Sequence, residues 1–324
     1  MQMILRYIIG LVVGLALLVW SAGLFVGSAA ALSRRCGMSP LLVGMFVIGF
    51  GTSLPEMAVS AISAFRGNPG IALGNAYGSN IANILLILGL TAVLAPIAVA
   101  DGARKRDLPV LCVVTAAAWL LALDGSVSRL ESILMLVAFT GICAWNAAHE
   151  QLPQEDAGGA DTHPVWRLAA GILVGLALVL ASSMLLVWAA TGLATALGVP
   201  DLIIGLTIVA VGTSLPELAS SIAAISKNEH DMALGNIIGS NLFNTLAVVG
   251  IAGAVSPITG ESASSVVHTL LVRDFPAVGL ATLALFLFCL RFGGRQAKID
   301  RWKGVVFLAM YACYVAILAK GALA

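Results

Sequence analysis

The second half of this sequence repeats the first. When the chain is shifted by 161 positions, residues 41–90 align with residues 202–251 without a gap. The hexapeptide Gly-Thr-Ser-Leu-Pro-Glu stands at 51–56 and again at 212–217. A fold for this chain must therefore accommodate the same structural unit twice, with the repeated polar residues in equivalent places.

Both copies lie in apolar sequence. Hydrophobic residues make up 60% of the chain and charged residues 10%, and the mean hydropathy is +1.02, which excludes a soluble globular protein. A net charge of +1 gives no sign of a nucleic-acid partner. We expect an all-α membrane protein with ten transmembrane helices, because runs long enough to cross the lipid bilayer begin near residues 4, 40, 71, 108, 131, 166, 201, 232, 269 and 303.

Five of these spans fall in residues 1–150 and five in residues 165–324, with a short polar linker at 151–164. An odd number of spans makes the second half enter the membrane from the opposite side. We therefore predict two inverted-topology five-helix repeats related by a pseudo-two-fold axis in the membrane plane, which is typical of secondary transporters. A duplication kept only for packing would favour apolar identities, whereas the best-matched stretch is polar.

The two ends of the predicted spans differ in charge. The side that holds the termini collects five basic residues, and the opposite side collects twelve. Loops rich in Lys and Arg stay in the cytoplasm. We therefore predict a multi-pass protein of a prokaryotic plasma membrane (inner membrane), with both termini outside and the linker in the cytoplasm.

Each hexapeptide places a carboxylate inside a span, where an unpaired charge is costly. In the first copy, Thr52 and Ser53 precede Glu56 by four and three residues, so both hydroxyls share its helix face. A carboxyl group kept protonated by desolvation is one interpretation, but the recurrence of the hydroxyls in both halves favours a site for a cation. The equivalent residues of the second copy are Thr213, Ser214 and Glu217.

A proline precedes each of these glutamates. Because proline has no amide proton, Pro55 leaves the carbonyl group of Gly51 without its helical partner, and Pro216 does the same to Gly212. We predict a local break in each helix beside its glutamate, which frees main-chain carbonyl groups as candidate ligands.

The third and eighth predicted spans carry polar stripes at steps of four residues, which place them on one helix face. For Asn75 and Asn236 two interpretations stay open, hydrogen bonding between helices and direct ligation of an ion. Glycines at the same spacing allow close helix approach. The stripes are Asn75, Ser79 and Asn83 and then Asn236, Ser240 and Asn244, and the glycines are Gly74, Gly78, Gly235 and Gly239.

Together these residues offer only oxygen ligands. The four histidines are expected in loops, and the five cysteines show no Cys-x-x-Cys spacing. Oxygen ligands suit hard cations such as Na⁺ and Ca²⁺, and Mg²⁺ fits a flexible, water-poor site less well. Two carboxylates balance one Ca²⁺ and can also hold Na⁺ or protons, so one pocket can take competing ions in turn.

The repeated motifs resemble those of the calcium/cation antiporter superfamily, in particular the sodium/calcium exchangers and their bacterial relatives. Besides the hexapeptides, Gly-Asn-x-x-Gly-Ser-Asn-x-x-Asn at 74–83 and 235–244 matches the two alpha repeats of that family. The resemblance covers almost the whole chain. It implies a secondary active antiporter that exchanges Na⁺ for Ca²⁺ by alternating access, with the first and sixth helices sliding across the other eight and no cofactor besides the transported ions.

The resemblance also implies a ligand set, in which the two glutamates are shared by Ca²⁺ and Na⁺. Ser79 and Ser240 would line the outer and inner Na⁺ sites. Asn244 stands where some relatives have an aspartate, which leaves the number of Na⁺ ions open. The implied ligands are Glu56, Glu217, Thr52, Ser53, Thr213, Ser214, Ser79, Ser240, Asn83 and Asn244, with the carbonyl groups of Gly49 and Ala210.

Three other functions agree less well with this pattern. Ca²⁺/H⁺ antiporters of the same fold have a sequence that resembles Gly-Asn-Ala-Val-Glu in place of the hexapeptide. The Thr-Ser pair of this chain therefore favours Na⁺ as the counter-ion, with H⁺ as a competitor. A passive channel agrees less well with inverted halves and broken helices. An enzyme is not expected, because Ser53 and Ser214 have no His or Lys inside a span to act as a base. We expect the functional unit to be a monomer.

Overall fold

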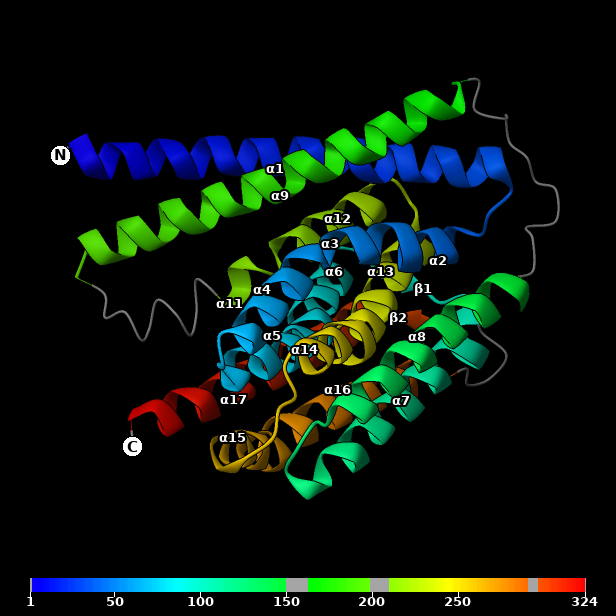
Figure 1. The fold of residues 1–324 in the computed structure, drawn as a ribbon. Helices are drawn as coiled ribbons and strands as arrows, with labels where there is room; N and C mark the ends of the chain where they lie inside the picture. Colours follow the sequence, from blue (N-terminus) through cyan, green and yellow to red (C-terminus); the bar gives the residue numbers. More distant parts are fainter. Residues whose placement is uncertain (1, 150–162, 199–209, 291–296, 324) are drawn as a thin grey trace.

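The computed structural model describes residues 2–149, 163–198, 210–290 and 297–323, and this part of the chain is almost entirely helical (Figure 1). Its α-helices are α1 (Gln2–Cys36), α2 (Pro40–Val43), α3 (Phe50–Thr52), α4 (Leu54–Phe65), α5 (Pro69–Ile81), α6 (Gly89–Leu94), α7 (Leu108–Leu121), α8 (Arg129–His149), α9 (Val165–Ala196), α11 (Ala210–Gly212), α12 (Leu215–Ser226), α13 (His230–Leu242), α14 (Val249–Val255), α15 (Glu261–Val272), α16 (Asp274–Phe288) and α17 (Arg301–Leu323).

Wider π-helical turns interrupt several spans, and such turns are frequent at functional sites. A single 3₁₀ turn follows α7, and two short strands complete the described elements. These elements are η1 (Gly44–Gly49), η2 (Ala82–Leu88), η3 (Ala103–Asp107), η4 (Ala122–Asp124), η6 (Phe243–Val248), β1 (Ile97–Ala98) and β2 (Lys298–Ile299).

The described part of the chain contains eight helices long and apolar enough to cross a membrane, or nine when a bent pair is taken as one span. The bent pair is Pro40–Thr52 with Leu54–Phe65. Nine of the ten predicted spans correspond to these helices, including the one predicted to begin near residue 108, which runs over Ala103–Asp124. Residues 201–209 of the remaining predicted span lie outside the described residues, and α12 is a shorter apolar helix from its second part. The count of ten stays a prediction.

The two spans with polar stripes lie at the centre of the bundle. The apolar window of His230–Val255 is 89% buried and that of Pro69–Leu94 is 72% buried, whereas that of Arg301–Lys320 is 11% buried. Polar side chains in a membrane are stable where they face other protein groups instead of lipid. The fold therefore places the repeated asparagines and serines in its interior.

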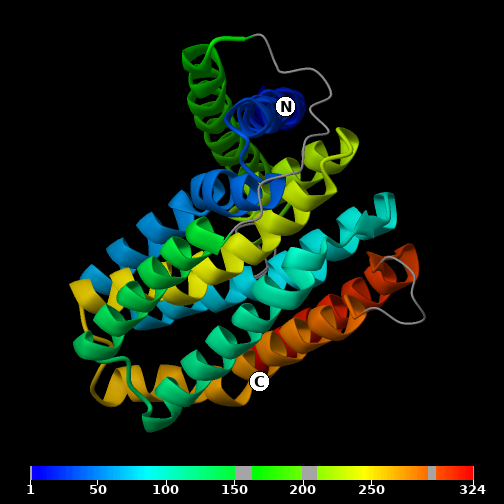
Figure 2. The ribbon, with the colours of Figure 1, turned by 90° about the vertical axis from the view of Figure 1, so that its right-hand side faces the viewer.

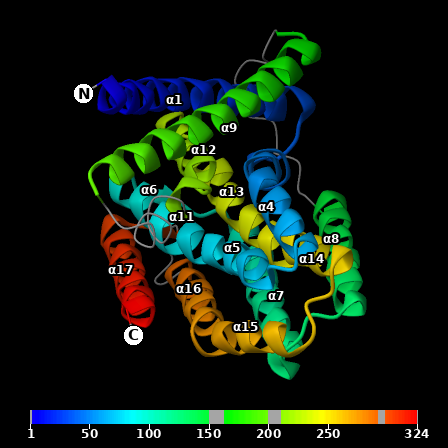
Figure 3. The ribbon, with the colours of Figure 1, turned by 60° about the vertical axis from the view of Figure 1, so that its left-hand side comes forward.

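Helices α1 and α9 lie side by side over the other helices (Figures 1 and 3), and Figure 2 shows the pair with α1 end-on. A Cβ added to Gly10 would lie 3.0 Å from the Cβ of Ala189, and one added to Gly171 would lie 3.0 Å from the Cβ of Ser28. Gly171 and Ala189 follow Gly10 and Ser28 by 161 positions. Reciprocal contacts of this kind are those of a two-fold axis.

The two halves are interleaved in space. Ile97 in β1 pairs with Ile299 in β2, and its repeat equivalent Ile258 pairs with Val127. In each pair one residue comes from each half. The helices follow the same rule, because α6 packs against α17 and α14 packs against α8. The short strands are an addition to the all-α expectation.

The close helix approach predicted at four glycines is confirmed at Gly235 and Gly239 and is not found at Gly74 and Gly78, where an added Cβ would meet nothing within 4 Å among the described residues. A Cβ added to Gly239 would lie 2.6 Å from the carbonyl oxygen of Met45 and 2.7 Å from its Cα. A Cβ added to Gly235 would collide with the carbonyl oxygen of Leu41. Helix α13 therefore packs with its backbone directly on α2 and η1 of the other half.

The expectation that the histidines lie in loops was wrong for three of the four. His149 is the last residue of α8 and His230 is the first residue of α13. His268 was expected in a loop, but it lies in α15 with an exposed side chain. The polar sequence around it, with serines at 262, 264 and 265, concealed the helix that leads into α16.

Candidate cation site

Both hexapeptides interrupt a helix at their serine, two residues before the proline. Ser53 (φ −83°, ψ 1°) separates α3 from α4, and the two parts of that span meet at 45°. Ser214 (φ −94°, ψ 9°) precedes α12 in the same way. Pro55 and Pro216 stand in the first turn after each break, where a proline costs no hydrogen bond. The predicted breaks are thus confirmed, and each glutamate begins a new helix.

The two glutamates are fully buried, with 0% of each side chain exposed. Neither carboxylate oxygen of Glu56 has a hydrogen-bond partner among the described residues, and neither has Oε2 of Glu217. Glu56 and Glu217 also interact electrostatically with each other. Two buried carboxylates with three of their four oxygens unpartnered are unstable as anions unless positive charge reaches them.

Hydroxyl groups of the first hexapeptide reach residues of the second half. Ser53 Oγ donates to Glu217 Oε1 at 3.4 Å. Thr52 Oγ1 donates to the carbonyl oxygen of Ile48 at 3.1 Å and lies 3.4 Å from Asn236 Oδ1. The oxygens predicted in different halves therefore converge on one place.

Further buried oxygens come from segments that pack against the glutamate helices, since η6 contacts α4 and η2 contacts α12. The side chains of Asn83 in η2 and Asn244 in η6 are fully buried, and none of their amide atoms has a partner among the described residues. The same is true of the hydroxyl groups of Ser214 and Ser240. Ser79 in α5 is 5% exposed. In ordinary protein interiors such groups are hydrogen-bonded, so a cluster of them indicates a binding site.

Three further candidate ligands from the sequence are Gly49, Thr213 and Ala210. The carbonyl oxygen of Gly49 accepts the amide of Ser53 at 3.1 Å and also lies 3.4 Å from Thr52 Oγ1. Thr213 lies between α11 and α12 and lines a cavity. Ala210 is the first residue of α11. The chemistry of the site therefore rests on the buried carboxylate, hydroxyl and amide oxygens.

Asn75 and Asn236 play the same structural part in both halves. Asn75 Nδ2 donates to the carbonyl oxygen of Glu56 at 3.2 Å, and Asn236 Nδ2 donates to that of Glu217 at 3.2 Å. This geometry favours the first of the two open interpretations, hydrogen bonding between helices. The residues that sequence reasoning missed are their second partners, Ser60 and Ser221, although these serines also match at the 161-residue offset.

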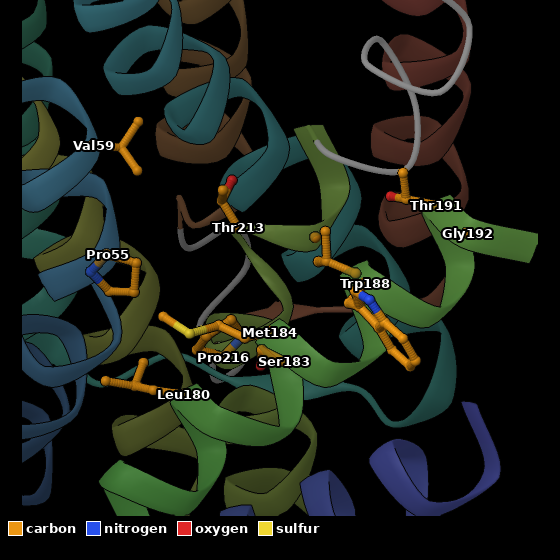
Figure 4. A pocket seen from close by; sticks show the side chains of 12 residues that line it. Pro55, Val59, Leu180, Ser183, Met184, Trp188, Thr191, Gly192, Thr213 and Pro216 are labelled. Carbon is orange, nitrogen blue, oxygen red and sulfur yellow. The ribbon is translucent and has the colours of Figure 1, made fainter. Parts of the chain in front are cut away.

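A cavity of about 610 Å³ adjoins the site (Figure 4). Pro55 and Val59 of α4 form one wall and Trp188 and Thr191 of α9 the other, with Thr213 between them. The cavity is mostly apolar, and it separates the first turn of α4 from α9. It provides space next to the broken helices on one side of the site.

The sequence matches the family described as "Sodium/calcium exchanger protein" over residues 6–147 and 167–320. The chain belongs to the sodium/calcium exchanger family. Members of this family are transporters, so the expectation that the protein is not an enzyme is confirmed. The two matched stretches also correspond to the two halves of the repeat.

Several relatives match over nearly their full length. The "Putative antiporter CaxA" of Alkalimonas amylolytica is 43% identical over 314 residues, which are 94% of this chain and 96% of that protein. The "Inner membrane protein YrbG" of Escherichia coli is 36% identical over 320 residues, 95% of each. The "Sodium/calcium exchanger MaX1" of Methanosarcina acetivorans is 28% identical over 359 aligned positions, 95% of this chain and 97% of that protein.

The fold also matches a solved structure. The sodium-calcium exchanger NCX_Mj, soaked with 10 mM Na⁺ and zero Ca²⁺, superposes with a TM-score of 0.82 and 31% sequence identity, covering 97% of this chain and 99% of that one. The family predicted from the repeated motifs is therefore confirmed, as is a multi-pass membrane protein. The described residues of this exchanger family member therefore have the fold of NCX_Mj.

Proposed function

We propose that this exchanger moves Na⁺ and Ca²⁺ in opposite directions across the membrane by alternating access. The observation that carries the proposal is the convergence of buried, unpartnered carboxylate oxygens from Glu56 and Glu217, one from each half of the repeat. One Ca²⁺ balances both charges, and Na⁺ ions can replace it at the same oxygens. Binding of one ion then excludes the other, as exchange requires.

The ligand set that we propose follows the buried oxygens. Glu56 and Glu217 stand at the centre, and main-chain carbonyl groups at the helix breaks complete the coordination. Hard cations select such an all-oxygen environment. The other proposed ligands are Thr52, Ser53, Thr213, Ser214, Ser79, Ser240, Asn83 and Asn244, with the carbonyl groups of Gly49 and Ala210.

We also propose ten spans in two inverted five-helix repeats, residues 1–150 and 165–324, joined by a cytoplasmic linker at 151–164. The reciprocal contacts of α1 with α9 support this arrangement, because an axis in the membrane plane would generate them. So do the equivalent hydrogen bonds of Asn75 and Asn236. The excess of basic residues on one side supports termini that face outward, and the inner-membrane relative YrbG supports a prokaryotic inner membrane. The functional unit in this proposal is a monomer.

Sodium coupling is favoured over proton coupling by the hydroxyl pair of each hexapeptide. Purified protein in vesicles loaded with ⁴⁵Ca²⁺ should release the isotope when external Na⁺ is added at constant pH. A pH step without Na⁺ should give little release, because Ser53 and Thr52 are retained as Na⁺ ligands. Release driven by the pH step alone would assign the protein as a Ca²⁺/H⁺ antiporter of the same fold.

Alternating access is supported by a difference between the two ends of the α1 and α9 pair. Arg34 in the last turn of α1 pairs with Glu229, with 2.7 Å between Nη1 and Oε1. Lys227, which follows α12, places its Nζ against Gly27 of α1. The repeat equivalents of Arg34 and Glu229 are Thr195 and Asn68, which cannot form an ion pair. In place of an ion pair, the 610 Å³ cavity lies between α9 and α4 at this end of the α1 and α9 pair.

This ion pair should hold α1 closed on the loop between α12 and α13. Arg34→Glu or Glu229→Arg should each raise the rate at which a maleimide labels a cysteine introduced by Gly27→Cys. The expected increase is up to about fivefold, since exposed ion pairs contribute about 0.2–1 kcal/mol. The exposed Cys36 and Cys313 would first be changed to serine.

The double variant Arg34→Glu, Glu229→Arg restores opposite charges and should return labelling to the starting rate. Equal labelling in all four proteins would show that the pair does not hold this face closed.

A further inference from the structure

Each glutamate of the site is anchored through its main chain by an asparagine of the neighbouring helix. Asn236 Nδ2 donates to the carbonyl oxygen of Glu217 at 3.2 Å and to Ser221 Oγ at 2.9 Å. The equivalent distances from Asn75 Nδ2 to Glu56 and Ser60 are 3.2 and 3.0 Å. Two copies of one arrangement, separated by 161 residues, agree within 0.1 Å.

Both protons of an amide nitrogen are used in this arrangement. An amide group offers two donors, and here one points to a main-chain carbonyl group and the other to a hydroxyl group. Only the oxygen of a side-chain amide can bind a cation, and the two hydrogen bonds of the nitrogen fix where that oxygen lies. The amide oxygen of Asn236 lies 3.4 Å from Thr52 Oγ1, so this residue also contacts the hexapeptide of the other half.

The anchored carbonyl groups lie in the first helical turn after each break. Glu56 and Glu217 lie in the first turn of α4 and α12, directly after the breaks at Ser53 and Ser214. In the first turn of a helix the amide groups lack intrahelical partners, whereas the carbonyl groups accept hydrogen bonds from the next turn. The asparagine amide adds a further bond to this carbonyl group and ties the turn to the neighbouring helix. Both carboxylate oxygens of Glu56 and Oε2 of Glu217 still have no hydrogen-bond partner among the described residues.

We propose that Asn75 and Asn236 are positioning residues, which fix the main chain of the two glutamates so that their carboxylates face the ion. Ser60 and Ser221 in turn hold the amide groups in place. This inference rests on the proposed function of the site, and it replaces direct ligation by these two asparagines. The groups around a metal ligand that orient it commonly change the affinity for the ion when they are removed.

Substitution by aspartate separates positioning from ligation. Asn236→Asp keeps an oxygen at Oδ1 and adds charge, but it removes both donors. A ligand would bind Ca²⁺ at least as well after this change. A positioning residue should lose about 10- to 100-fold in Ca²⁺ affinity, similar to the loss in Asn236→Ala.

The experiment measures Ca²⁺ binding to detergent-solubilised full-length protein by the rise in its melting temperature with Ca²⁺ concentration. Asn241→Ala is the matched control, because Asn241 is a buried amide in the same helix. Its Nδ2 donates to the carbonyl oxygen of Ile237, and within the described residues it has no hydrogen bond to a glutamate. The control should lower the melting temperature without ions but keep the wild-type Ca²⁺ dependence. Asn236→Ala and Asn236→Asp should lose that dependence in the same concentration range.

Each outcome decides the matter. Wild-type affinity in Asn236→Asp would overturn positioning in favour of ligation, and equal losses of affinity in Asn236→Ala and Asn241→Ala would reduce the effect to general packing. If Asn236 variants do not fold, Ser221→Ala carries the test, with a threefold or larger loss supporting the proposal and an unchanged affinity overturning it. Wild-type protein that ignores Ca²⁺ would instead refute the proposed function itself.

Discussion

Glu56→Gln and Glu217→Gln should each abolish Na⁺-dependent Ca²⁺ release from vesicles. Glutamine keeps the size of the side chain and one oxygen, but the pair then holds a single negative charge against a divalent ion. Removing one partner from a buried contact between opposite charges, here a carboxylate and Ca²⁺, costs about 3–5 kcal/mol. This cost corresponds to a loss of more than about a hundredfold in Ca²⁺ affinity. ⁴⁵Ca²⁺ flux and equilibrium binding measure the two consequences separately.

Glu131→Gln is the control for these variants. Glu131 accepts the amide of Ser128 at 2.7 Å, and its own amide donates to Ser128 Oγ at 3.2 Å, so it caps the start of α8. The Ca²⁺ flux of the Glu131→Gln protein should stay near the wild-type value, because glutamine also serves in such a capping pair. Full transport by either Glu56→Gln or Glu217→Gln would remove that glutamate from the ligand set.

Gly239→Val should prevent the protein from assembling. A Cβ at this position would lie 2.6 Å and 2.7 Å from two backbone atoms of Met45, and a backbone cannot move aside as a side chain can. Overpacking commonly costs about 1–3 kcal/mol, and a branched side chain against a backbone should exceed that range. Size-exclusion profiles and melting temperatures of the purified protein would show the loss.

The matched control for that substitution is Gly141→Val in α8. Gly141 is exposed on the outer surface, and its added Cβ would meet no described atom within 4 Å. Valine there should leave both the size-exclusion profile and transport unchanged. A stable, monodisperse Gly239→Val protein would mean that α13 and η1 can separate, contrary to the packing described above.

Much of this architecture could be predicted because a membrane leaves a chain few options. Apolar runs of sufficient length become helices, since the backbone has no water to bond with. The two Gly-Thr-Ser-Leu-Pro-Glu segments then indicate breaks at equivalent depths, and the structure has them at Ser53 and Ser214. The family followed from the same motifs.

Other features depended on contacts that no local pattern encodes. Asn75 and Asn83 lie on one stripe of one span and look alike in sequence, yet Asn75 donates to Glu56 while both amide atoms of Asn83 stay without partners. The pairing of Ile97 with Ile299 and the Arg34–Glu229 ion pair likewise join residues far apart in the chain.

The order of residues alone therefore determined that the chain crosses a membrane as helices, that it contains one unit twice, and which polar side chains recur. Only the tertiary structure decided which of these oxygens remain free for an ion and which amides are consumed in anchoring the glutamates. The reason is physical: helix formation and membrane insertion depend on local composition, whereas the partner of a buried polar group depends on which helix faces meet.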